Sequence, residues 1–191
     1  MINFSIINID GARGIGIDTQ INMLRKYLED SGKKVSLTYL KSFNSIKAEN
    51  QGIKQFLETN PDYVIISEGS FARIMAKDII SGLNFKIIDE KYRDYINDYI
   101  TLKYKYNMIN IVLTPENIEF CNERTIKKNR LMGIESKGIE NFQLEADIVN
   151  IMENFNNNTI LNQLNFAVVY VKEKDSILEV HDKILKKLEG K

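Results

Sequence analysis

Short apolar runs alternate along the chain with segments in which apolar residues recur every three or four positions. Ile2 to Ile9 is the first apolar run and is rich in β-branched residues, which predicts a strand. From Asp18 to Ser31 the apolar residues Ile21, Leu24 and Leu28 recur at helical spacing, which predicts an amphipathic helix. A glycine-rich turn separates the two.

The same alternation continues to the end of the chain. Further strands are predicted at Val35–Leu40, Tyr63–Ile66, Met108–Leu113 and Phe166–Val171. Further helices are predicted at Ile46–Leu57, Phe71–Ile80, Ile88–Tyr104, Ile118–Lys128, Gly138–Phe155 and Ile177–Leu188. Apolar strands separated by helices indicate a parallel sheet covered on both faces. We therefore expect a three-layer α/β/α fold with a five-stranded parallel sheet, and residues 1–191 as a single domain.

Composition and charge narrow the function classes. The 191 residues are 43% hydrophobic and 27% charged, which is typical of a soluble globular domain with a sizeable core. Lys plus Arg and Asp plus Glu each number 26, so the formal net charge is zero. A general nucleic-acid binder usually carries a basic excess, so we do not expect one here.

Three further features bear on location. The single cysteine excludes an intrachain disulfide, and a reducing cytoplasm is the simplest expectation. No run of about 18 apolar residues occurs, so no membrane span is expected. The first residues, MINFSIINIDG, lack a basic segment before the apolar stretch, so a strand is expected there rather than a signal peptide.

The glycine-rich turn, GARGIGIDT at 11–19, carries the most specific chemistry. Glycines let backbone amides converge, and a helix N-terminus adds partial positive charge, so such a turn can hold an anion. The turn follows the phosphate-binding pattern G-x-x-x-x-G-K-[ST] at Gly11 and Gly16. Ile17 stands at the lysine position and Asp18 at the Ser/Thr position, with Thr19 next.

These replacements change the chemistry of the turn. The lysine of the pattern neutralises phosphate charge, which Ile17 cannot do. Asp18 can ligate a cation but brings a negative charge toward a phosphate, and like charges about 4 Å apart repel by roughly 4 kcal/mol at an effective dielectric near 20. Alternatively, Asp18 caps the first helix, or the turn is purely structural.

A second nucleotide-binding family competes for the same turn. The segment GARGIG resembles the nucleotide turn of short-chain dehydrogenases, and Tyr99 and Lys103 have the Tyr-x-x-x-Lys spacing of that family. However, the family pattern requires glycine where Asp10 stands, and no serine lies suitably upstream of Tyr99. We keep an NAD(P)-binding dehydrogenase as a remote alternative.

Segments spread over nearly the whole chain resemble those of thymidylate kinases, in the same order. The resemblance is carried by Asp10-Gly11, Thr19-Gln20, Leu24, Leu28-Glu29, Gly32 and Val35, then Leu113–Glu116, Glu123-Arg124, Lys127-Lys128, Glu135–Phe142 and Ser176–His181. It implies a P-loop nucleoside or nucleotide kinase fold, ATP and Mg²⁺ as cofactors, dTMP or a related nucleoside or nucleotide as substrate, and a homodimer. It also implies a LID-like segment at about 125–138.

The departures from that family fall on its phosphate chemistry. Glu68-Gly69-Ser70 follows the third strand, where thymidylate kinases have Asp-Arg-aromatic and deoxynucleoside kinases have Glu-Arg-Ser. The acid is kept and the arginine is lost, although Arg73 follows one helical turn later. Arg13 stands where the family has a sugar-binding carboxylate. The stretch from Thr19 to Glu68, which carries substrate contacts in the family, is shortened.

The resulting site predictions are specific. Predicted cofactor-binding residues are Gly11, Gly14, Gly16, Ile17, Asp18, Thr19, Arg124 and Lys128. Predicted catalytic residues are Glu68, Arg13 and Arg130, predicted substrate contacts are Arg73 and Phe71, and predicted Mg²⁺ ligands are Asp18 and Glu68. The structural alternatives are a helix-capping role for Glu68, a solvated helix end for the basic residues at 124–130, a packing role for Cys121 and a surface or capping role for His181.

Two functions remain open from the sequence. The first is a degenerate nucleotide-binding or regulatory relative with weak or no kinase activity. The alternative is an active ATP-dependent phosphotransferase.

Overall fold

A computed structural model describes residues 2–39, 46–69, 71–82, 85–133, 142–157 and 161–190. The strands are β1 (Ile6–Gly11), β2 (Lys34–Tyr39), β3 (Tyr63–Glu68), β4 (Met108–Pro115) and β5 (Phe166–Val171). They form one sheet in the order β2-β3-β1-β4-β5, and every adjacent pair is parallel. The helices are α1 (Ile17–Asp30), α2 (Ile46–Thr59), α3 (Phe71–Ile80), α4 (Phe85–Tyr106), α5 (Ile118–Leu131), α6 (Phe142–Glu153) and α7 (Ile177–Glu189), with short 3₁₀ helices at Asn154–Asn157 and Leu161–Leu164.

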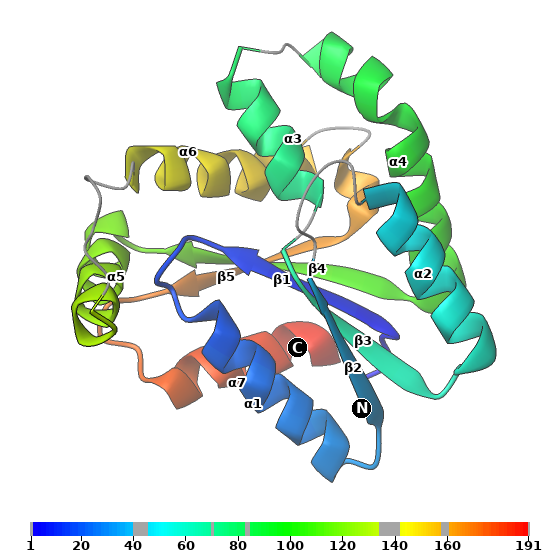
Figure 1. Cartoon of the computed structure of the whole chain (residues 1–191), viewed down its shortest axis with the longest axis horizontal. Helices are drawn as coiled ribbons and strands as arrows, with labels where there is room; N and C mark the ends of the chain where they lie inside the picture. The colour runs from blue at the N-terminus through cyan, green and yellow to red at the C-terminus, as the bar shows by residue number, and fades with distance from the viewer. Residues whose placement is uncertain are drawn as a thin grey trace.

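Helices cover both faces of the sheet. Figure 1 shows α1 and α7 together on one face and α2, α3, α4 and α6 on the other, with α5 at the end of the sheet where β1 runs into α1. The predicted three-layer α/β/α fold with a five-stranded parallel sheet is therefore confirmed. Among the described helices, none combines the length and apolar character needed to cross a bilayer.

The core follows from the apolar pattern. All six residues of β1 are buried, as expected for a central strand with helices on both sides. On α1 the predicted positions Ile21, Leu24 and Leu28 are buried at 4%, 0% and 1% exposure. Burying each of these side chains contributes roughly 1.5–3 kcal/mol, so this one face holds α1 against the sheet.

A row of polar side chains crosses the buried sheet. Strand register places Thr38, Ser67, Asn8 and Asn110 side by side on four adjacent strands. The Asn8 amide nitrogen donates to the Tyr99 hydroxyl at 2.7 Å and to Asn110 Oδ1 at 2.9 Å. These bonds satisfy groups that would otherwise be costly to bury, and they tie α4 to the sheet.

The strand order determines which strand ends lie beside the glycine turn. Because β3 rather than β2 lies next to β1, Ile9 pairs with Glu68 in the register. The carboxyl end of β3 therefore lies beside the glycine turn that follows β1. A dinucleotide-binding sheet has the order 3-2-1-4-5-6 instead, with β2 next to β1. The observed order disfavours the dehydrogenase alternative.

Some local predictions differ from the structure. The first strand begins at Ile6 rather than Ile2, and the helix predicted to reach Phe155 ends at Glu153, where a 3₁₀ helix follows at Asn154–Asn157. His181 was expected at the surface but is 7% exposed, with Nδ1 3.3 Å from Gln20 Oε1. The reason is tertiary: α7 packs on α1, so its inward face is set by that helix. The start of the predicted 138–155 helix and residues 134–138 of the LID-like segment lie outside the described residues.

Candidate functional site

Two glycines give the turn its shape. Between the end of β1 at Gly11 and the start of α1 at Ile17, Gly14 has φ of 83° and Gly16 has φ of 101°. This left-handed region is disfavoured for residues with a Cβ atom. The turn therefore depends on glycine at both positions.

The turn packs closely on neighbouring elements. A Cβ atom on Gly11 would lie 2.6 Å from the Leu113 carbonyl oxygen of β4. On Gly14 it would lie 2.2 Å from the Cys121 carbonyl oxygen and 2.4 Å from Thr125 Oγ1, both on α5. Only glycine allows these approaches, so α5 is held directly against the turn. Cys121 itself is buried, which raises the pKa of its thiol to about 12, and its role is packing.

Helix α1 begins without a side-chain cap. Its N-cap residue is Gly16, and the first helical hydrogen bond runs from the Gln20 amide to the Gly16 carbonyl at 3.1 Å. Within the described part of the chain, the amides of Ile17, Asp18 and Thr19 have no protein acceptor. Free amides and the helix dipole favour an anion at this end.

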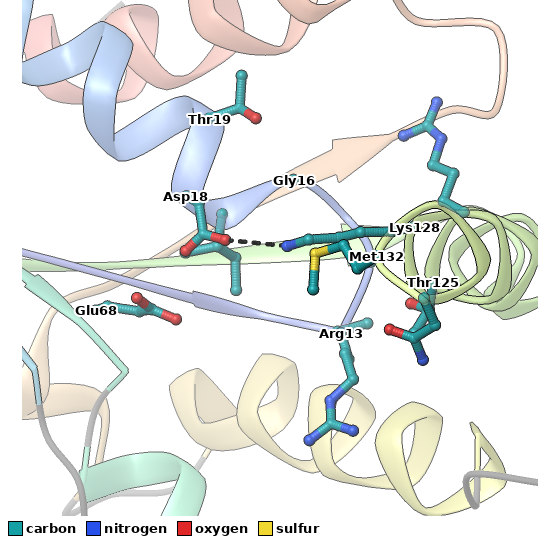
Figure 2. A pocket seen from close by; sticks show the side chains of 13 residues that line it. Arg13, Gly16, Asp18, Thr19, Glu68, Thr125, Lys128 and Met132 are labelled. Atoms are coloured by element: carbon teal, nitrogen blue, oxygen red, sulfur yellow. Dashed lines mark ion pairs between the residues drawn. The ribbon is translucent and has the colours of Figure 1, made fainter. Parts of the chain in front are cut away.

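A cavity of about 510 Å³ opens in front of these amides (Figure 2). The residues that line it are Ala12, Arg13, Gly14, Gly16, Ile17, Asp18, Thr19, Glu68, Arg124, Thr125, Lys128, Asn129 and Met132. Three elements meet here: the glycine turn with the start of α1, the end of β3, and α5. The glycine turn and Glu68 therefore lie at the same edge of the sheet.

One face of α5 completes the cavity. Cys121, Thr125, Lys128 and Met132 lie on this face at helical spacing, and the last three line the cavity. Lys128 extends from α5 toward α1, with Nζ 3.7 Å from Asp18 Oδ2 (Figure 2). The two side chains are 65% and 66% exposed, and such exposed pairs contribute little stability. Lys128 can therefore exchange Asp18 for another anion at low cost.

The two carboxylates of the cavity interact. Burial raises the pKa of the Glu68 carboxyl, and the charges of Asp18 and Asp10 and a hydrogen bond with Asp18 raise it further. Lys128 acts in the opposite direction. Mg²⁺ is commonly held by one or two carboxylates together with phosphates and water, so Asp18 and Glu68 fit this ion. No larger group of metal-ligating side chains occurs in the described residues. From the first turn of α1, Asp18 contacts both Lys128 and Glu68.

Arg73 lies in a different place from the one predicted. Its Nη1 donates to Asp10 Oδ1 at 3.2 Å and to the Gly11 carbonyl at 3.0 Å, and its Nη2 donates to Glu145. Arg73 does not line the cavity. Glu145 Oε2 also accepts from the Arg13 amide at 3.3 Å. Arg73 thus joins α3 to β1, the glycine turn and α6.

This ion cluster is largely buried. The side chains of Arg73, Asp10 and Glu145 are 20%, 5% and 17% exposed. Burial alone would lower the pKa of the Arg73 guanidinium, but the two carboxylates outweigh burial and raise it. The sequence pattern did not identify Asp10 or Glu145 as partners of Arg73. An acid at the end of a buried strand signals an internal partner for Asp10, whereas Glu145 has no such local signal.

The other predicted residues are spread around the cavity. Figure 2 shows the Arg13 side chain directed toward α6, away from Lys128, and Thr19 directed away from Glu68. The Arg124 guanidinium lies 4.9 Å from the Phe120 ring, and its Nη2 donates to the Glu173 carbonyl at 3.4 Å.

Besides Arg73, Gly11 and Arg130 are predicted site residues that do not line the cavity. Gly11 is buried at the end of β1, and Arg130 is exposed on α5. Phe71 begins α3, and its side chain lies outside the described part of the structure.

Tyr99 and Lys103, the pair with dehydrogenase spacing, lie away from the cavity at the glycine turn. Tyr99 is buried against the sheet, where its hydroxyl accepts from Asn8. Lys103 Nζ donates to the Gln163 carbonyl at 2.6 Å. Neither residue lines the cavity at the glycine turn. The geometry therefore gives no support to the remote alternative.

When compared with known proteins, the chain matches solved structures but no family model or curated sequence. Among solved structures, the chain is similar to the structure of deoxyadenosine kinase from M. mycoides with bound dATP, at a TM-score of 0.47 and 13% identity. The match covers 97% of this chain and 99% of that one. At this similarity it assigns neither an activity nor a substrate to this chain.

Proposed function

We propose that this chain is a thymidylate-kinase-like P-loop protein that binds the phosphates of a nucleoside triphosphate at the glycine turn, with weak or no phosphotransfer. In this role it acts as a nucleotide-binding or regulatory relative of the kinases. The observation that carries the proposal is the convergence of free α1 amides and Lys128 on one cavity that also contains Glu68.

The phosphates would be held by two kinds of donor. The amides of Ile17, Asp18 and Thr19 belong to residues that line the cavity, and they carry the partial positive charge of the helix end. Lys128 brings an ammonium group to the same place from α5. It would neutralise phosphate charge in place of the lysine that Ile17 replaces. The weak ion pair with Asp18 makes this exchange inexpensive.

Mg²⁺ would be held by Asp18 and Glu68. When bound, the ion would neutralise phosphate charge and orient the phosphate chain. In the free protein burial raises the pKa of the Glu68 carboxyl, and the nearby charge of Asp18 raises it further. Their role in this chain would be to accept the cation, whose charge would offset the repulsion between the two carboxylates.

Slow phosphotransfer follows from three replacements. Ile17 supplies no charge to the transferred group, Asp18 adds a negative charge, and Gly69 lacks the arginine that would hold an acceptor. Arg73 does not compensate, because its guanidinium is engaged by Asp10 and Glu145. Each loss of about 1.36 kcal/mol of transition-state stabilisation slows a reaction tenfold, so the combined effect is large.

An active phosphotransferase is the second candidate, and the position of Glu68 favours it. Glu68 lies at the end of β3 inside the cavity, beside the proposed phosphate site. Such an enzyme would pass the γ-phosphoryl group of ATP to an acceptor oxygen of dTMP or a related nucleoside or nucleotide. ADP would leave, and the acceptor proton would pass to the carboxylate of Glu68. Homodimer formation, which the family resemblance implies, is a further expectation that sedimentation can test.

Binding is tested with a matched pair of lysines. Calorimetric titration of the protein with MgATP should give saturable binding, which Lys128→Met weakens about tenfold by removing one charge–phosphate contact. Lys127→Met is the control, because Lys127 is exposed on the same helix and does not line the cavity. Absence of ATP binding, or an equal loss in both variants, would contradict the proposal.

Activity is tested with a panel of acceptors. The purified protein is incubated with MgATP and nucleosides or nucleoside monophosphates, and phosphorylated products are followed. The proposal expects products at rates far below about 1 per second, the lower end for typical kinases. Products at ordinary kinase rates that Glu68→Gln abolishes would establish the second candidate instead.

A further inference from the structure

Two hydrogen-bond donors converge on a single oxygen beside the glycine turn. Glu145 Oε2 accepts from the backbone amide of Arg13 at 3.3 Å and from Nη2 of Arg73. A backbone amide together with a guanidinium is a donor set that binds phosphate oxygens as readily as carboxylate oxygens. Glu145 thus fills a position that suits an oxyanion.

The donors do not depend on Glu145 for their placement. Arg73 is anchored through Nη1, which donates to Asp10 Oδ1 and to the Gly11 carbonyl. Asp10 is 5% exposed and accepts from the Gly11 amide at 2.7 Å, so this anchor is buried and hydrogen-bonded to the turn. The Arg13 amide belongs to the turn itself. Both donors thus have a support in the structure that does not involve Glu145.

Glu145 also places a negative charge against the turn. Its side chain is 17% exposed, so solvent screens its charge less than that of an exposed carboxylate. A phosphate bound at the turn would be repelled by this charge. Glu145 contacts the turn from α6. Gly14 of the same turn packs on α5.

We propose that Glu145 is an internal anion that competes with an external phosphate for the glycine turn, so that the free protein is held in an autoinhibited state. A phosphate oxygen displaces the carboxylate and accepts from the Arg13 amide and Arg73 Nη2. This inference rests on the proposed function, because it requires that the turn binds phosphate. It adds that occupancy of the turn is linked to the position of α6.

The test compares charge removal at two positions of α6. Glu145→Gln keeps an acceptor for both donors but removes the charge, and Glu145→Ala also vacates the oxygen position. Asp147→Asn is the matched control, since Asp147 lies two residues away, accepts from Gln143 at 2.9 Å and does not contact the turn. Inorganic phosphate and ATP are titrated by calorimetry against the wild-type protein and each variant.

Both Glu145 variants should bind phosphate and ATP about tenfold more tightly than the wild-type protein, while Asp147→Asn stays within about twofold. Adding Arg73→Lys to Glu145→Ala should remove the gain, because one ammonium cannot serve both Asp10 and a phosphate. Thermal unfolding verifies that each variant is folded. If Glu145→Ala unfolds, Glu145→Gln decides the outcome alone.

Several results would overturn the inference. If the wild-type protein binds ATP through Lys128 but the Glu145 variants bind no more tightly, the inference is wrong and the proposed function stands. If Asp147→Asn gives the same gain, overall charge is responsible rather than the contact with the turn. If neither the wild-type protein nor any Glu145 variant binds phosphate or ATP, the proposed function falls and the inference falls with it.

Discussion

Lys128 of α5 and Asp18 of α1 face each other across the opening of the glycine turn, with Nζ 3.7 Å from Oδ2. The pair sets a cation from a distant segment beside the start of α1, where the chain itself supplies Ile17. It also masks the one charge on α1 that would repel a phosphate.

Asp18→Asn should strengthen binding of ATP in the absence of Mg²⁺. The variant removes a negative charge beside the phosphate site and frees Lys128, so about a tenfold gain is expected after solvent screening. With Mg²⁺ present the gain should shrink or reverse, because Asp18 is a proposed ligand. Calorimetry with EDTA or MgCl₂ measures both. Asp30→Asn, exposed at the other end of α1, is the control. A similar gain in both buffers would show that Asp18 does not hold the ion.

Gly14→Ala should destabilise the protein by roughly 2–4 kcal/mol. The left-handed backbone costs about 1 kcal/mol, and the clash of the new Cβ with the Cys121 carbonyl and Thr125 Oγ1 adds about 1–3 kcal/mol. Gly32→Ala is the matched control, since Gly32 has φ of 81° but nothing within 4 Å of the added atom. Urea unfolding measures both. Equal losses in the two variants would mean that α5 yields to the added atom.

Arg73→Met should be among the most damaging single changes, at about 3–5 kcal/mol of unfolding free energy. The variant leaves Asp10, which is 5% exposed, and Glu145 without their shared cation. Combining it with Asp10→Asn should recover part of the loss, because the buried charge is then removed as well. Denaturant unfolding of the two single variants and the double variant tests this coupling. Strictly additive losses would argue against an interaction between Arg73 and Asp10.

His181 should make the stability pH-dependent. Burial lowers the pKa of His181 below its ordinary value of 6.5, although the charge of Asp182 acts in the other direction. The unfolded chain therefore binds a proton more readily than the folded protein. This contribution to stability is present above pH 6.5 and is lost as the pH falls through the folded-state pKa.

Unfolding free energies at pH 7.5 and pH 5.5 measure this effect in the wild-type protein and in His181→Gln, which can still hydrogen-bond to Gln20. The wild-type protein should lose more stability than the variant on acidification. Identical pH profiles would exclude His181 as the source. Glu68 does not mimic the effect, because its pKa is raised. Its contribution to stability is present below 4.5 and is lost as the pH rises through the folded-state value.

Much of the fold was predictable from local pattern. The apolar run before Gly11 and the helical spacing of Ile21, Leu24 and Leu28 gave the strand, the turn and the first helix. The position of Glu68 after a short apolar run placed it at the carboxyl end of a strand. These features depend on periodicity and on turn residues, and both are properties of neighbouring positions in the chain.

Contacts between elements were not predictable in the same way. Arg73 was expected at a substrate and lies between Asp10 and Glu145, because α3 packs on α6. His181 was expected at the surface and lies against Gln20, because α7 packs on α1. Each of these outcomes depends on which helices meet, and sequence spacing carries no information on that.

The sequence alone was enough for the α/β alternation, for the glycine turn and for the loss of lysine at Ile17, since these are properties of residue type and order. Only the tertiary structure brought Glu68 beside the turn, through the pairing of β3 with β1, and brought Lys128 to Asp18 through the packing of α5 on Gly14. The physical reason is that charge interactions and close packing depend on distance in space, which strand order and helix packing decide.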